Sequence, residues 1–103
     1  MLGTKIVMDE AKIQKEGVYD LAAMYATIDE AATKLDFTKR DKYTYVAKDD
    51  KYALAHLGIF CYKKLMKSDW FIDNVFQWIW LDDEEGNSDM MKDIKEFRKQ
   101  NNV

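Results

Sequence analysis

The chain contains one histidine, His56, and one cysteine, Cys61, two residue types that commonly carry nucleophilic and acid–base chemistry. A cysteine nucleophile needs a nearby base that favours its thiolate form. Five residues apart on one helix, these side chains would be separated by about 140° and would not face each other. They are also too few for a structural zinc site. We expect Cys61 in the core and His56 at its edge, and we predict no catalytic residue, metal or cofactor.

Acidic side chains are densest between positions 82 and 89, where the sequence is DDEEGNSD. A calcium-binding EF-hand loop with Gly86 at its sixth position would begin at Leu81 and end at Lys92, where carboxylates are required. The match therefore fails. We interpret the stretch as an acidic, solvated turn before a helix, with a weak surface cation site as the alternative.

A cluster of basic and aromatic residues is the only combination in the sequence that resembles a nucleic-acid-binding surface. Its members are Lys39, Arg40, Lys42, Tyr43 and Tyr45. Aromatic rings beside cations can stack with bases. The chain as a whole has a net charge of −3, and neither half is basic, so it lacks a general attraction for phosphate. Nucleic acid is therefore an unfavoured partner, and this cluster is kept as the alternative site.

The segment from Trp70 to Leu81 is the most apolar part of the chain, with more large apolar side chains than one face of a helix or strand can bury. Tryptophan and other large aromatic residues often carry the binding energy of protein interfaces. The surplus indicates either a central place in the core or a surface that meets a protein partner. The candidate partner-binding residues are Trp70, Phe71, Trp78 and Trp80.

The secondary structure of this aromatic tract is ambiguous. Polar residues at four-residue spacing, Asp69, Asp73 and Gln77, favour a helix. The run 75–81 is rich in strand-forming residues. We predict a helix throughout, and a helix from Ser68 that changes to a strand near position 76 is the alternative.

The remaining elements follow from local patterns. Local patterns predict a short helix over Glu10–Glu16, a second helix from Asp20 to about Asp36, a third helix after position 50 and a last helix from Ser88. The third helix contains Gly58, which we expect a close crossing or an aromatic ring to compensate. A short strand is predicted at Tyr43–Val46, and a short strand or an ordered arm at Thr4–Met8.

The totals fit one domain that spans residues 1–103, with 48% hydrophobic and 34% charged residues. A single cysteine cannot form an intrachain disulfide, and we find neither a signal peptide nor an apolar run of about 18 residues. These features favour a cytoplasmic location without a membrane partner.

The fold class that we predict is mainly α with a small β element (α+β): a compact single domain of four to five helices around an aromatic-rich core. The β element is expected around Tyr43–Val46, paired with Thr4–Met8 or with Phe76–Trp80. Without a recognisable catalytic motif, the favoured function is a small non-enzymatic protein-binding module, such as an inhibitor, an immunity-type protein or a mobile-element accessory protein. It would bind an unidentified protein or self-associate. The alternatives are a nucleic-acid-associated regulator and a domain with no deducible activity.

Overall fold

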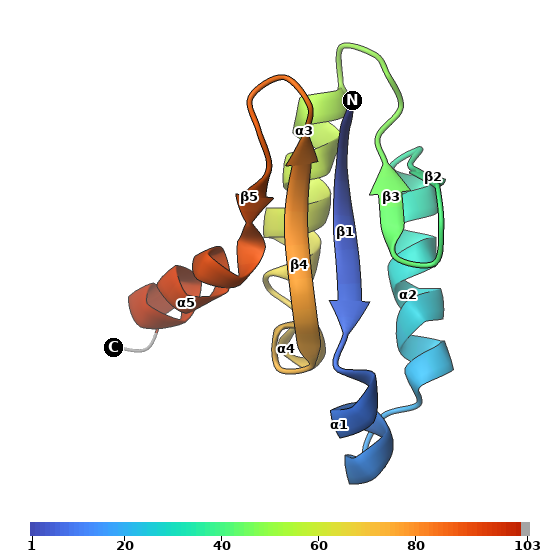
Figure 1. The fold of residues 1–103 in the computed structure, drawn as a ribbon, viewed down its shortest axis with the longest axis vertical. Coiled ribbons are helices and arrows are strands. Elements are labelled where there is room, and N and C mark those ends of the chain that lie inside the picture. Colours follow the sequence, from blue (N-terminus) through green and yellow to red (C-terminus); the bar gives the residue numbers. More distant parts are fainter. Residues whose placement is uncertain (102–103) are drawn as a thin grey trace.

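The computed structural model describes residues 1–101, which form a five-stranded antiparallel sheet with helices packed against it (Figure 1). The order of strands across the sheet is β2-β3-β1-β4-β5. The elements, in chain order, are β1 (Leu2–Met8), α1 (Glu10–Glu16), α2 (Leu21–Lys34), β2 (Thr38–Lys39), β3 (Thr44–Val46), α3 (Ala53–Gly58), the π-helical segment η1 (Ile59–Leu65), α4 (Asp69–Ile72), β4 (Val75–Asp82), β5 (Ser88–Asp89) and α5 (Met90–Asn101).

The prediction of a mainly helical domain with a small β element is wrong, because the sheet is substantial and central. Strand β1 lies in its middle and pairs with β3 on one side and with β4 on the other. The predicted pairing of the strand near 43–46 with the N-terminal segment is confirmed, since Thr4 lies opposite Tyr45. Local patterns do not show that β4 pairs as a long strand with β1. They also show neither of the two short edge strands.

The aromatic tract is divided between a short helix and a long strand. Helix α4 ends at Ile72, and β4 begins at Val75. The prediction of a continuous helix is therefore wrong, and the alternative of a helix followed by a strand is confirmed. The strand forms because it pairs along the whole length of β1, and backbone hydrogen bonds of that kind cannot be read from the periodicity of one segment.

Alternation along β1 explains which side of the sheet is buried. Thr4, Ile6 and Met8 point toward the helices and are almost completely buried, whereas Lys5 and Val7 point to the other side and are half-buried. In the view of Figure 1, α2 and the continuous helix α3–η1 lie behind the strands. The core is therefore a single layer between this helical pair and one face of the sheet.

Aromatic rings fill the layer between sheet and helices. The ring of Phe60, on η1, lies 5.1 Å from that of Phe37 and 5.9 Å from that of Tyr45. Phe71 meets Trp78 edge to face, with their ring centres 4.9 Å apart. Such edge-to-face pairs add stability beyond the area that they bury.

One buried polar contact fixes the middle of this layer. The indole Nε1 of Trp78 donates a hydrogen bond to Oγ1 of Thr4 (3.0 Å), and Oγ1 of Thr4 donates to the backbone carbonyl of Ile79 (2.9 Å). Both side chains are fully buried, and each of their polar atoms has a partner. The contact joins β1 to β4 through side chains as well as backbone. It also gives the buried indole N–H a hydrogen-bond acceptor, so burial of the tryptophan leaves no unpaired donor.

The helix predicted from Asp20 is confirmed as α2, and its apolar residues Met24, Ile28 and Ala32 are buried. Within residues 1–101, no helix is both long and apolar enough to cross a membrane.

Two glycines allow a matched test of the fold. A Cβ at Gly3 would lie 2.4 Å from the carbonyl oxygen of Tyr45, so β1 and β3 approach too closely for any side chain there. At Gly58 a Cβ would meet nothing within 4 Å, and the backbone is helical (φ −62°, ψ −43°). The prediction that an aromatic ring or a close helix crossing compensates Gly58 is therefore wrong.

We expect Gly3→Ala to lower the free energy of unfolding by about 1–3 kcal/mol, because backbone atoms must move to admit the methyl group. Gly58→Ala should raise it by about 0.5–1 kcal/mol, since alanine is the better helix former. Urea unfolding followed by circular dichroism measures both. Equal effects of the two substitutions would contradict the close approach at Gly3.

Candidate functional site

The aromatic residues predicted to bind a partner lie mostly inside the protein. Phe71 and Trp78 are 0% exposed, and Trp70 and Trp80 are partly buried against the core. The most exposed aromatic residue of the tract is Phe76, at 67%. It lies at an irregularity where Gln77 pairs with Val7 and Val75 pairs with Met8, which leaves Phe76 without an opposite residue.

His56 and Cys61 lie where the sequence predicts them. Cys61 is completely buried, and His56 is partly exposed with its ring stacked on that of Tyr52. Burial raises the pKa of the Cys61 thiol to about 12. A thiol in this state is a poor nucleophile at neutral pH, so the residue serves packing.

Burial of the Cys61 thiol predicts slow chemical modification of the native protein. At pH 8, iodoacetamide should modify Cys61 of the native protein more than about 100-fold more slowly than Cys61 of the urea-unfolded chain, because few thiolates form and access is blocked. Mass spectrometry against time measures both rates. Val18→Cys, at an exposed position, is the control and should gain one rapidly modified thiol. Rapid labelling of the native parent chain would contradict the burial of Cys61.

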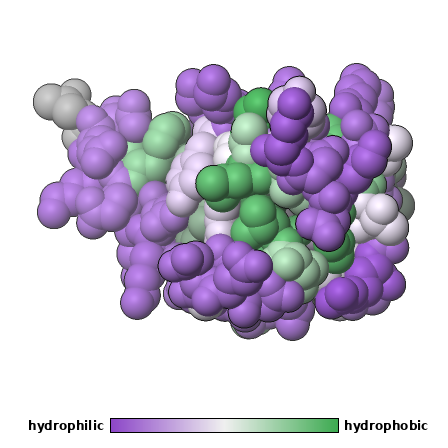
Figure 2. Space-filling view, turned by 90° about the horizontal axis from the view of Figure 1, so that it is seen from above, coloured by the Kyte–Doolittle hydropathy of each residue, from purple (hydrophilic) through white to green (hydrophobic). Residues whose placement is uncertain are grey.

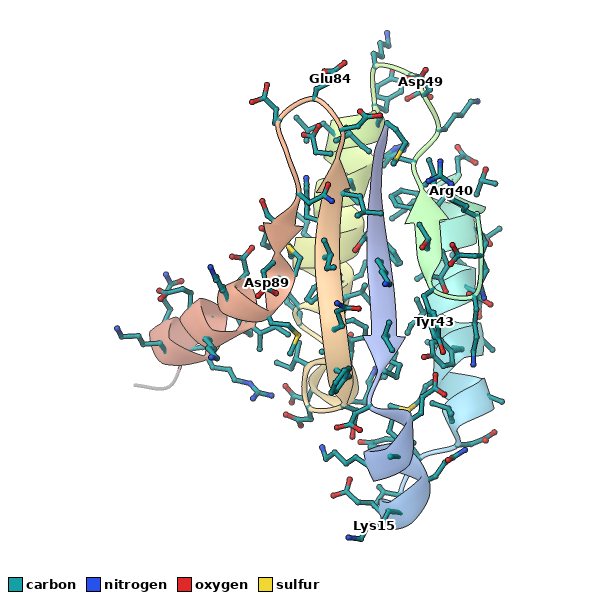
Figure 3. The ribbon with its side chains drawn as sticks, in the orientation of Figure 1. Lys15, Arg40, Tyr43, Asp49, Glu84 and Asp89 are labelled. Atoms are coloured by element: carbon teal, nitrogen blue, oxygen red, sulfur yellow. The ribbon has the colours of Figure 1, made fainter. Side chains whose placement is uncertain are left out.

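The basic and aromatic residues of the alternative nucleic-acid site are held in contacts with carboxylates. Nζ of Lys39 lies 3.0 Å from Asp29, whose carboxylate also accepts a hydrogen bond from the hydroxyl of Tyr45. Nζ of Lys42 lies 3.6 Å from Glu10. These contacts reduce the positive charge that the cluster offers to phosphate groups. Burial of the Tyr45 ring removes one stacking surface, and Arg40 remains exposed on the β2–β3 connection (Figure 3).

A hydrogen-bonded cluster around Glu10 attaches α1 to the rest of the fold. Its carboxylate accepts hydrogen bonds from the hydroxyls of Tyr25 (2.8 Å) and Tyr43 (3.1 Å). The Tyr25 hydroxyl in turn accepts one from the backbone N–H of Met8. The bond from Tyr25 is the largest cause that lowers the pKa of Glu10 below its ordinary value, and the contacts with Tyr43 and Lys42 act in the same direction.

This shift predicts a pH dependence of stability. A lowered pKa in the folded state means that ionised Glu10 stabilises the protein above its ordinary pKa and that this contribution is lost as the pH falls. We therefore expect Glu10→Gln to be less stable than the parent at pH 7, with a difference that shrinks between about pH 5 and pH 3. Chemical unfolding at each pH measures it. Glu30→Gln, on the exposed side of α2, should show a much smaller change at pH 7; similar changes in both variants would contradict this role of Glu10.

A concave surface lies at the end of the sheet where β1 begins (Figure 2). We call it the end hollow; it has a volume of about 510 Å³. It is bounded by the start of β1, the end of β3, the start of α3 and the two loops that follow β3 and β4. The lining residues are Met1, Leu2, Val46, Ala47, Asp49, Asp50, Lys51, Ala53, Leu54, Asp82, Glu84 and Glu85.

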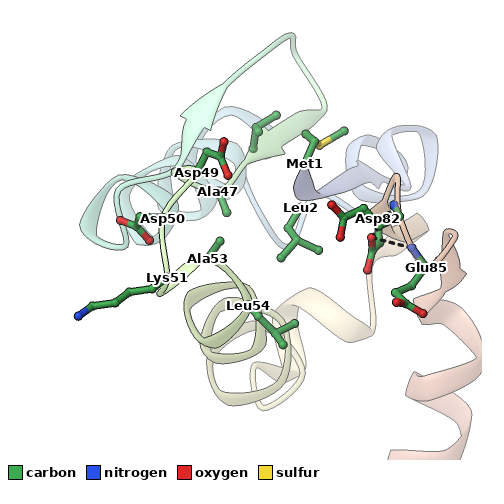
Figure 4. A pocket seen from close by; sticks show the side chains of 12 residues that line it. Met1, Leu2, Ala47, Asp49, Asp50, Lys51, Ala53, Leu54, Asp82 and Glu85 are labelled. Atoms are coloured by element: carbon green, nitrogen blue, oxygen red, sulfur yellow. Dashed lines mark hydrogen bonds between the residues drawn. The ribbon is translucent and has the colours of Figure 1, made fainter.

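The floor and the rim of the end hollow differ in chemistry. Apolar side chains from three elements, Leu2, Ala47 and Leu54 among them, lie between the two loops (Figure 4). Leu54, at 62%, is the most exposed apolar side chain of the lining. The space-filling view shows the same contrast, with apolar surface in the centre of this end and polar surface around it (Figure 2).

The carboxylates of the rim come from both loops. Asp49 and Asp50 follow β3, and Asp82, Glu84 and Glu85 surround the turn after β4. In Figure 3, Asp49 and Glu84 lie at the same end of the molecule although they are far apart in the sequence. The antiparallel arrangement of β3, β1 and β4 brings them together, because both loops leave the sheet on the side where β1 starts.

Two of the carboxylates shape the loops that carry them. Oδ1 of Asp82 accepts hydrogen bonds from the backbone N–H groups of Glu84 (2.9 Å) and Glu85 (3.0 Å), and these bonds lower the pKa of Asp82. Oδ1 of Asp50 accepts one from the N–H of Tyr52 (2.8 Å), just before α3. These two aspartates therefore have a structural role that is independent of any partner.

In the described chain, the other rim carboxylates have no lysine or arginine partner, and the one cation at the rim is the N-terminal ammonium of Met1, which pairs with Asp83 (2.7 Å) and attracts Glu84 and Asp49. Within residues 1–101, no lysine or arginine nitrogen lies within 4.0 Å of Asp49, Glu84 or Glu85. Lys51, the one basic lining residue, extends away from the hollow in Figure 4, and its Nζ lies 5.1 Å from the ring centre of Tyr52. The end hollow is thus an apolar surface in a negative field.

Sequence reasoning did not identify the end hollow. The sequence predicts an acidic, solvated turn at residues 82–89, and nothing in it indicates that this turn lies near Asp49 and Asp50. Among the residues that the structure describes, no group of three histidine, cysteine or acidic side chains could hold a metal ion. Comparisons of the chain with known protein families, with curated proteins and with solved structures find no match.

Proposed function

We propose that this chain is a small, non-enzymatic protein-binding module that receives part of a partner protein in the end hollow. The observation that supports the proposal is the apolar surface of this hollow, to which exposed Leu54 and half-buried Leu2 and Ala53 contribute. Contact between a large aliphatic side chain and water is unfavourable. Its burial by a partner stabilises the complex by about 25 cal/mol per Å² of apolar surface buried. Exposed apolar surface with a polar surround is typical of interaction sites.

The chemistry of the lining also favours binding over catalysis. Among the described residues that line the hollow, none is a histidine, cysteine or serine. The carboxylates Asp50 and Asp82 are engaged by backbone N–H groups of their own loops. An apolar floor positioned by rigid strands, with polar groups on loops, is a common arrangement for recognition.

Photo-cross-linking tests the proposal in the cells that make the protein. A photoreactive phenylalanine derivative in place of Leu54 should form a discrete adduct with another polypeptide, because the position lies at the edge of the proposed interface. The same substitution at Val18, which is 71% exposed and lies in the connection between α1 and α2, is the matched control. No adduct at position 54, or the same adducts from both positions, would contradict the proposal.

A further inference from the structure

The arrangement of charge around the end hollow specifies the chemistry of the partner. Carboxylates lie on both sides of the apolar floor: Asp49 and Asp50 on one loop, Glu84 and Glu85 on the other. A ligand that fills the hollow must bring an apolar group to the floor and must face negative charge on two sides. The complementary ligand is an apolar side chain with cationic neighbours.

We propose that the end hollow binds a segment of a partner protein in which an apolar side chain is flanked on both sides by lysine or arginine. This inference rests on the proposed function and adds the chemistry of the partner to it. The volume of about 510 Å³ is within the range of sites that hold small ligands or side chains. Leucine, isoleucine, methionine or phenylalanine would cover Leu2, Ala53 and Leu54.

Three features of the rim favour this occupant. First, Asp49, Glu84 and Glu85 form no ion pair in the described chain, because the one ammonium at the rim, that of Met1, pairs with Asp83. Second, they lie on loops that are already shaped by Asp50 and Asp82, so binding does not have to order them. Third, like charges gathered on one surface repel each other, and a cationic partner relieves this repulsion.

Other occupants fit the surface less well. Nucleic acid and anionic lipid would bring phosphate groups against the carboxylates of the rim. A free polyamine carries charge along its length and would leave the apolar floor around Leu54 uncovered. An uncharged apolar segment would cover the floor but would gain nothing from Asp49, Glu84 and Glu85.

Selection from a random peptide library tests the inference without a known partner. A displayed library of twelve-residue peptides is selected on the immobilised full chain, and peptides that also bind the Leu54→Asp variant are removed. Because Leu54 is exposed, this variant should keep the fold, which circular dichroism checks. The expected result is enrichment of peptides with an apolar residue between lysine or arginine residues.

A neutralised rim provides the matched control. The triple variant Asp49→Asn, Glu84→Gln, Glu85→Gln leaves the loop-shaping Asp50 and Asp82 unchanged. Synthetic peptides from the selection should bind this variant about tenfold more weakly than the parent chain in fluorescence anisotropy. Their affinity for the parent should fall as salt rises from about 0.05 to 0.5 M, with much less change for the variant.

The outcomes separate this inference from the proposed function. Peptides that depend on Leu54 but lack lysine and arginine, or that bind the triple variant as tightly as the parent, would overturn the inference and leave the protein-binding proposal intact. The absence of any Leu54-dependent peptide would overturn both. If the chain is dimeric in light scattering and Leu54→Asp makes it monomeric without basic peptides being enriched, the occupant is a second copy and the inference is wrong.

Discussion

The antiparallel pairing of β1 with β4 is the interaction on which the rest of the structure depends. It runs from Leu2 opposite Asp82 to Met8 opposite Val75, and so joins the first strand of the chain to a segment about seventy residues later. Closing so long a loop costs conformational entropy, which is recovered only when many contacts form together. The hydrogen bond from Trp78 to Thr4 adds a buried side-chain contact to this ladder, where few other arrangements would satisfy the indole N–H.

The same pairing creates the end hollow. Because β1 begins between the end of β3 and the end of β4, the loops that follow those two strands come to lie on either side of Leu2. The backbone N–H of Ala47 donates to the carbonyl of Leu2 (2.8 Å) and closes one side of the floor. The hollow is thus a consequence of strand order, and its acidic character is a separate property of the two loops. Asp50 and Asp82 are explained by their turns, whereas the fold does not require acidic residues at Asp49, Glu84 and Glu85.

The parts of the fold that the sequence predicts are those stabilised within one segment. Helix α2 follows from apolar spacing, and β3 follows from the composition of Thr44–Val46. Strands β2 and β5 have only two residues each, and neither has a composition that distinguishes it from a loop. For β4 the local signals conflict, since aromatic and β-branched residues favour a strand while polar spacing favours a helix. The conflict is settled by pairing with β1, which no pattern within residues 69–81 contains.

The candidate site was not predictable for the same reason. Each acidic loop is ordinary by itself, and only the sheet places them around a common apolar floor. The composition of the aromatic tract, in contrast, is unusual, and for this reason the sequence predicts a binding surface there. Two of its members, Phe71 and Trp78, are completely buried in the core, because a thin two-layer domain needs such side chains to bury enough apolar area. Aromatic content therefore indicates binding only after burial has been taken into account.

The sheet edges and the open face of the sheet offer less for the proposed recognition than the end hollow does. The edge strands β2 and β5 are too short to add a partner strand along more than two residues. The sheet face that the helices leave open mixes Lys5, Val7 and Gln77 with aliphatic residues, as expected of an antiparallel sheet with one solvated side. The end hollow combines apolar surface, concavity and an excess of negative charge, and it lies on loops held by the strands of the core. A partner that binds there would meet a preformed surface, so binding would not include the entropy cost of ordering the site.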